Sequence, residues 1–283
     1  LMTAISGAAH AQASDYYSRD KYEAVSERRQ PEFDPEPVRL GAFLVDSSAY
    51  AGLGYTSNAL GTSANEESDT VAEIGVDVTA RTNWSVHEVA VDLSARHDEY
   101  QDFSDQSSDD LSARIRGRLD VSREISLGAA AFYQHSADQY YDPSNTSGLA
   151  EPIVFDRTGV DLNANYSNDR VRWYNVLTFS EIDYDDSITI DGIPIDQDFR
   201  DSSETRLFSR LSYAVTPNLA VFGQGIVEQR EYDNGVFIGG VERSRDSEIY
   251  TVYGGVDFEL NTLIRGDVAV GFMSEEMDDS FFE

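Results

Sequence analysis

Apolar and polar residues alternate along most of this chain with a period of two, beginning near Phe43. Residues 72–80, for example, place alanine, isoleucine and valine on one face and Glu73, Asp77 and Thr79 on the other. Such alternation is typical of β-strands that have one apolar and one polar face. The pattern predicts eleven strands, at 43–56, 72–80, 87–95, 111–121, 125–133, 158–166, 171–179, 207–215, 219–227, 250–258 and 264–272.

The connections between these strands are alternately short and long. The short ones are rich in turn-forming residues and lie at 82–85, 122–124, 167–170, 216–218 and 259–263. The long ones cover 57–69, 98–109, 135–153, 181–204 and 229–247. Bacterial outer-membrane barrels have this asymmetry, with tight turns in the periplasm and long loops outside. The sequence therefore predicts an all-β fold, an antiparallel up-and-down transmembrane β-barrel.

The composition of the apolar face supports a lipid-facing surface. In the ten strands after the first, the predicted segments carry no Asp, Glu, Lys or Arg on this face. An Arg or Lys that faces lipid at mid-depth costs about 2–4 kcal/mol. A soluble sandwich core would exclude charge too, but it needs large interlocking side chains. Small residues such as Ala113, Gly117 and Gly223 suit lipid chains better.

Aromatic residues are predicted to form two belts, as interfacial anchoring requires. Near the short turns lie Trp84, Tyr166, Trp173, Tyr213 and Phe258. Near the long loops lie Tyr55, Tyr133, Phe179 and Phe272.

The turn positions also predict the register of three hairpins. The expected neighbours are Val78 with Val89, Val76 with Val91, Leu119 with Leu127, and Ala164 with Trp173. Each pairing keeps the apolar residues on one side of a continuous sheet. Across the next connection, Asp92 is expected near Arg116.

Charge and cysteine content narrow the function. The chain has 52 acidic and 21 basic residues and a formal net charge of -31, which disfavours nucleic acid as a partner. It has no cysteine, so thiol catalysis and thiolate metal sites are excluded. No apolar run approaches the roughly 18 residues of a membrane helix.

The ends of the chain suggest processing and further strands. Residues 1–13 have the small and apolar residues and the Ala-x-Ala sites of the end of a secretory signal peptide. Residues 14–42 are polar, contain three prolines and predict an extended periplasmic lead-in. Residues 43–283 are the predicted barrel. Eleven strands do not close a barrel of even strand number, so we expect the barrel to be incomplete at its C-terminus.

Three short segments carry a family resemblance. The residues RQPEFDP at 29–35, VRLGAFL at 38–44 and GYTSN at 54–58 resemble the entry segment of the putative β-barrel porin family of outer-membrane proteins. The resemblance implies an alphaproteobacterial-type barrel of the cell outer membrane, often linked to exopolysaccharide systems. It implies neither catalytic residues nor a cofactor.

The polar face holds the candidates for chemistry. Arg114, Arg116 and Arg118 alternate on one strand, and we call them the arginine ladder. The other pore-lining candidates are Asp92, Arg96, Asp77, Arg172, Arg206 and Arg210. One interpretation is a pore wall that selects polar solutes or conducts anions. The alternative is an ion-paired wall that fills or rigidifies the lumen.

The long loops and the histidines offer weaker candidates. The 181–204 connection is strongly acidic, and clustered carboxylates are Ca²⁺ ligands. Its candidates are Asp183, Asp185, Asp186, Asp196 and Asp198, although no EF-hand spacing is present and a solvated loop is the favoured explanation. His97-Asp98 and His135 lie near the long loops but lack any motif for catalysis, so no enzyme is predicted.

Three functions remain open from the sequence. The first is porin-like passage of polar solutes or a role in polysaccharide export. The second is a non-conducting structural or surface-interaction barrel, and the third is a soluble all-β binding domain. The expected partners are outer-membrane lipid and lipopolysaccharide, together with polysaccharide-export machinery.

Overall fold

The computed structural model describes residues 36–62, 65–138, 149–259 and 264–282. The expected signal remnant, most of the lead-in and residues 260–263 of the last short connection lie outside these ranges. None of the helices in the described ranges is long and apolar enough to span a membrane.

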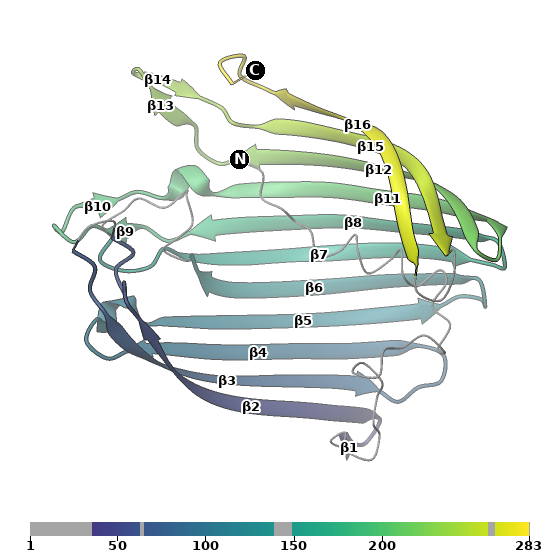
Figure 1. Cartoon of the computed structure of the whole chain (residues 1–283), viewed down its shortest axis with the longest axis horizontal. Helices are drawn as coiled ribbons and strands as arrows, with labels where there is room; N and C mark the ends of the chain where they lie inside the picture. The colour runs from purple at the N-terminus through teal and green to yellow at the C-terminus, as the bar shows by residue number, and fades with distance from the viewer. Residues whose placement is uncertain (1–35, 63–64, 139–148, 260–263, 283) are drawn as a thin grey trace.

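One antiparallel sheet dominates the structure (Figure 1). Its long strands have 13 to 15 residues each. They are β2 (Phe43–Thr56), β3 (Asp69–Thr82), β4 (Glu88–Tyr100), β5 (Ser108–Asp120), β6 (Ile125–Ala137), β7 (Val154–Ser167), β8 (Val171–Tyr184), β11 (Ser202–Thr216), β12 (Leu219–Tyr232), β15 (Ser247–Glu259) and β16 (Arg265–Met277). Each pairs with the next along the chain, so the predicted eleven-strand up-and-down fold is confirmed.

A twelfth, short strand precedes them. β1 (Val38–Leu40) folds back on β2 through a tight turn at Gly41, whose φ of 62° is in the left-handed region that glycine adopts easily. This pairing lies inside the segment 14–42 that we predicted to be an extended lead-in. The sheet is open, with β1 and β16 at its two edges. β2 and β16 run in the same direction, so they cannot pair with each other as antiparallel neighbours.

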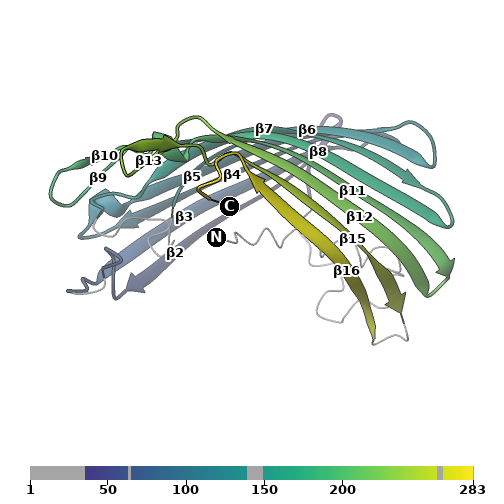
Figure 2. The same ribbon diagram turned by 90° about the horizontal axis from the view of Figure 1, so that it is seen from above.

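The sheet is strongly curved (Figure 2). On its polar side, contacts skip a strand: Arg114 of β5 pairs with Asp161 of β7, and Arg210 of β11 pairs with Asp257 of β15. Because side chains converge on a concave surface and diverge on a convex one, these contacts identify the polar side as the concave face. The convex face is apolar and open, with Ile115 53% and Val252 60% exposed.

The convex apolar band has the height of a membrane span. In β12 it covers the nine residues from Leu219 to Val227, and a tilted strand needs about 9–11 residues to cross a bilayer. The strands extend beyond the predicted segments toward the long loops. There the convex face does carry acids, including Glu99, Asp109, Asp156, Glu181, Glu231, Glu248 and Glu276.

Two of the three register predictions need correction. Val78 pairs with Leu93 rather than Val89, and Val76 pairs with Ala95 rather than Val91. The turn is longer than expected, at residues 83–87, and the Thr82 hydroxyl accepts the Val89 N–H at 3.0 Å. The shift is an even number of residues, so the faces are unchanged.

The other two hairpins behave differently from each other. Tyr166, not Ala164, pairs with Trp173, because a tight turn forms at residues 168–170. The Asn168 carboxamide oxygen closes this turn by accepting the Val171 N–H at 2.7 Å. The predicted pairing of Leu119 with Leu127 is confirmed.

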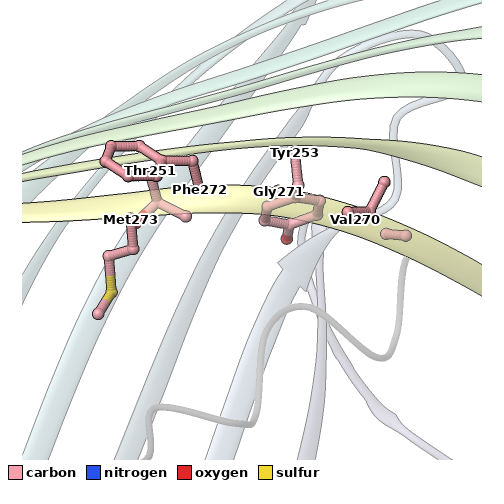
Figure 3. Close-up of a pocket in the computed structure, with 7 residues that line it drawn as sticks. Thr251, Tyr253, Val270, Gly271, Phe272 and Met273 are labelled. Carbon is pink, nitrogen blue, oxygen red and sulfur yellow. The ribbon is translucent and has the colours of Figure 1, made fainter.

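The alternation of faces persists to the free edge of the sheet. Phe272 and Met273 are neighbours in β16 and point to opposite sides of the strand (Figure 3). They line a shallow pocket at this edge together with Thr251, Tyr253, Ala269, Val270 and Gly271. Val270 and Phe272 face the convex side and are 82% and 68% exposed.

Candidate functional site

The arginine ladder lies on the concave face of β5, the fifth of the twelve strands in the sheet. The side chains of Arg114, Arg116 and Arg118 are 42%, 41% and 50% exposed. Successive ladder positions are two residues apart on an extended strand, so the three positions extend about 14 Å along β5. This is the largest set of partly exposed cations on one strand in the described structure.

Each ladder arginine has carboxylate partners. Arg116 pairs with Asp92, which confirms the neighbours expected from the sequence, and Arg114 pairs with Asp161. Arg118 Nε lies 3.1 Å from Asp120 Oδ1. The Asp92 carboxylate also accepts the Thr79 hydroxyl at 3.0 Å. The ladder is thus both ion-paired and accessible from the concave side.

The remaining pore-lining candidates also face the concave side, but they form separate groups. Arg96 lies 2.7 Å from Asp110, and Asp77 accepts a hydrogen bond from Ser48 at 3.4 Å. Across the sheet, Arg206 pairs with Glu228 at 3.5 Å.

Arg172 and Arg210 lie toward the short turns. Arg172 pairs with Ser212 across the strands, in the register of β8 and β11. Arg210 is 12% exposed and pairs with Asp257, which is 4% exposed, at 2.9 Å. Its guanidinium carbon stacks 3.8 Å from the Phe222 ring centroid. The Arg210 side chain is therefore packed into the wall rather than open to the concave side.

Charge is unevenly distributed across the concave face. Every arginine of the eleven long strands points to this face, as the register of each pair requires. At one edge, β2 and β3 contribute Asp46, Glu73 and Asp77 against Arg81. The centre, from β5 to β8, is richer in arginine. A solute on the concave face would therefore experience a field directed across the sheet.

Phe132 on β6 lies between two arginines. The guanidinium carbons of Arg114 and Arg157 are 5.5 and 5.9 Å from its ring centroid. The ring covers Gly159 on β7, its direct cross-strand partner. Three further concave aromatics also lie opposite glycines, in the pairs Tyr50–Gly75, Phe222–Gly255 and Tyr253–Gly271.

The long loops are joined to one another at their end of the sheet. Gln106 Nε2 donates to the Ala150 carbonyl oxygen at 2.6 Å, and the Ala150 N–H donates to Ile188 at 2.8 Å. Arg200 lies 2.5 Å from Asp138. Arg245 donates to the Phe199 carbonyl and stacks over Tyr232. The long connections therefore contain local structure that the alternation did not predict, including the hairpins β9 (Ser187–Ile188)–β10 (Pro194–Ile195) and β13 (Val236–Ile238)–β14 (Val241–Arg243).

Three of the five predicted calcium candidates come together. The carboxylate oxygens of Asp186, Asp196 and Asp198 lie within 4.8 Å of one another and are exposed. The negative charge of Asp196, assisted by burial, Asp186 and Asp183, raises the pKa of Asp198 above its usual value. Asp183 and Asp185 are not part of the cluster.

His97 and His135 point away from the concave wall. His97 is on the convex face of β4, where its ring nitrogens lie 2.9 Å from Asp109 and 3.0 Å from Glu99. Its chain neighbour Asp98 faces the opposite side, so the two do not form a pair. His135 contacts Asp156 at 2.8 Å on the same convex face. Neither histidine contacts a serine or threonine hydroxyl within the described ranges.

This architecture can be compared with known proteins. The family described as "Putative beta-barrel porin 2" matches residues 30–283, nearly the whole chain. The chain belongs to this family. The family resemblance predicted from the short entry segments is therefore confirmed. No curated protein matches the chain.

Two solved structures resemble this porin-family chain. "Copper transporter OprC" superposes with a TM-score of 0.50 and 12% identity, covering 80% of this chain and 44% of that one. "TodX monoaromatic hydrocarbon channel deltaS2 mutant" gives a TM-score of 0.37 and 12% identity, covering 83% and 73%. The chain spans less than half the length of the copper transporter, and the likeness concerns the fold alone.

Some features of the site depend on register and were missed from the sequence. Alternation alone places Arg157 on the polar face, but it does not reveal that Phe132 is its neighbour. That relationship follows from the pairing of β6 with β7, which aligns Phe132 with Gly159 and Gln134 with Arg157. A glycine among alternating polar positions is the one local signal of a cross-strand ring.

Proposed function

We propose that the protein forms a passage for polar solutes across a bacterial outer membrane, with its concave face as the wall of the passage. The observation that carries the proposal is the separation of residue types: all arginines of the eleven long strands are on the concave face, and the convex apolar band has the length of strand that crosses a bilayer. Family membership supports the porin-like reading. Lipid and lipopolysaccharide are the partners that the convex face fits, and acidic polysaccharide is one solute that the arginines fit.

A second function, a non-conducting structural barrel, is favoured by a different observation. Carboxylates neutralise the ladder, and the long loops are joined by hydrogen bonds at the mouth. A wall built in this way could be rigid and closed. The soluble all-β domain fits less well, because large aliphatic side chains cover the convex face and exposed apolar areas of this size mark membrane or protein contacts.

Single-channel recording of the full-length protein in a planar bilayer separates the first two functions. We expect stable conductance steps, with a selectivity that changes when Arg114, Arg116 and Arg118 are all replaced by serine. The field at the wall depends on these three charges, so their removal should shift the reversal potential toward cations. Insertion without conductance would favour the structural barrel, and conductance with unchanged selectivity would exclude the ladder as the selective element.

A further inference from the structure

Four consecutive concave positions on neighbouring strands form a polar row. Ser94 of β4 pairs with Ser112 of β5, Ser112 with Gln134 of β6, and Gln134 with Arg157 of β7. We call these four residues the open row. Neighbouring strands are about 4.8 Å apart, so the row extends about 14 Å across the wall.

The open row differs from the rows on either side of it. Toward the long loops, Arg96, Asp110 and Ser136 are joined by an ion pair and a hydrogen bond. Toward the short turns, Asp92 and Arg114 are held in the ion pairs of the arginine ladder. Both neighbouring rows thus use their polar groups internally.

The polar groups of the open row are not used in this way. Within the described ranges, the side chains of Ser94, Ser112 and Gln134 make no hydrogen bond to another residue. Arg157 donates to the Ser180 hydroxyl at 3.2 Å and has no carboxylate at ion-pair distance among the described residues. An arginine in a strongly acidic protein that lacks a carboxylate partner has donors available for an anion from outside.

We propose that the open row, together with Phe132, binds an acidic oligosaccharide whose carboxylate is held by Arg157. A guanidinium group is planar and matches a carboxylate with two parallel hydrogen bonds. The hydroxyls of Ser94 and Ser112 and the carboxamide of Gln134 offer donors and acceptors for sugar hydroxyls. The ring of Phe132 offers an electron-rich face to the C–H groups of a pyranose ring.

The ligand class follows from these groups taken together. An inorganic anion would use the arginines but not the row of hydroxyls. A neutral sugar would use the hydroxyls but leave the guanidinium group of Arg157 without a counter-charge. A uronic acid oligosaccharide uses both. The proposal rests on the concave face being the wall of the passage, and it names the class of solute that this wall holds.

Isothermal calorimetry on the full-length protein in detergent micelles tests the proposal without requiring conduction. The probes are trigalacturonate, the neutral trisaccharide maltotriose and inorganic phosphate. We expect trigalacturonate to bind about 10- to 100-fold more tightly than either of the others, since hydrogen bonds to a charged group contribute this much. Equal binding of maltotriose would overturn the role of Arg157, and equal binding of phosphate would overturn the role of the row.

Variants locate the binding. Arg157→Gln should weaken trigalacturonate binding about 10- to 100-fold, and Arg157→Lys, which keeps the charge but loses the planar pair of donors, should recover part of it. Arg81→Gln is the matched control. It removes one concave-face cation far from the row, and should leave affinity within about twofold.

The controls also separate this proposal from the passage itself. Wild-type affinity in Arg157→Gln, or equal losses in both glutamine variants, would overturn the subsite. If the protein conducts but does not bind trigalacturonate, the proposed subsite is wrong and the proposed passage stands. If the protein binds trigalacturonate but never conducts, the proposed subsite stands and the proposed passage is wrong.

Discussion

The ring of Phe132 lies directly over Gly159 on the neighbouring strand. A Cβ atom added at Gly159 would overlap the ring and would also lie 2.6 Å from the Phe179 carbonyl oxygen. Glycine at this position therefore allows an aromatic ring to lie low on the concave wall between Arg114 and Arg157. The ring in turn covers a residue that has no side chain to pack.

Replacing this glycine should disturb the wall. We expect Gly159→Ala to lower the free energy of unfolding by about 1–3 kcal/mol, because the ring or the backbone must move. Urea unfolding in detergent, followed by fluorescence, measures the change. Gly223→Ala is the matched control, since a Cβ there meets no atom within 4 Å. Equal effects of the two substitutions would contradict the role of the Phe132 contact.

The buried pair of Arg210 and Asp257 should be far more sensitive than an exposed pair. Arg210→Met leaves the Asp257 carboxylate, 4% exposed, without this cation, and breaking such a pair costs about 3–5 kcal/mol. Arg81→Met breaks an exposed pair with Asp46 at 3.9 Å and should cost no more than about 1 kcal/mol. The same unfolding assay compares them, and similar losses would contradict the packed geometry of the β11–β15 wall.

The two tryptophans should report the membrane interface. The chain has only Trp84 and Trp173, both near the short turns and 54% and 49% exposed. In bilayers, lipids brominated close to the headgroup should quench their fluorescence more than lipids brominated at the chain ends, because interfacial belts lie at headgroup level. Trp84→Phe and Trp173→Phe resolve the two contributions. If lipids brominated at the chain ends quench most strongly, the short turns do not lie at the membrane interface and the prediction is wrong.

The acidic loop cluster should respond to pH. Repulsion from Asp196 raises the pKa of Asp198 above 3.8, so folding of this loop is favoured below that pH and the advantage is lost as the pH rises through the raised pKa. Asp196→Asn should lower the pKa of Asp198 and flatten this dependence. Amide exchange at Arg200, whose N–H donates to Gln197 at 2.8 Å, measures the packing of the loop. An unchanged pH profile in the variant would contradict the coupling.

The sequence by itself determined which side chains share a face and how many long strands there are. A strand alternates with a period of two, so Arg114, Arg116 and Arg118 must lie on one side whatever the register is. The order of short and long connections indicated the up-and-down topology, because a short connection can join only antiparallel neighbours. The strand ends near the long loops were less predictable. There the convex face becomes acidic, although the hydrogen bonds between neighbouring strands continue.

Only the tertiary structure decided which residues on a face are neighbours. Turn length shifts a strand by an even number of residues without altering its pattern, as Val78 shows by pairing with Leu93 instead of Val89. The partners of Arg157, the glycine beneath Phe132 and the meeting of Asp186 with Asp196 all depend on such alignments. These contacts join residues that are far apart in the sequence or that are brought together by the folding of a loop. An alternating pattern shows the face of each residue but not its neighbour on the next strand.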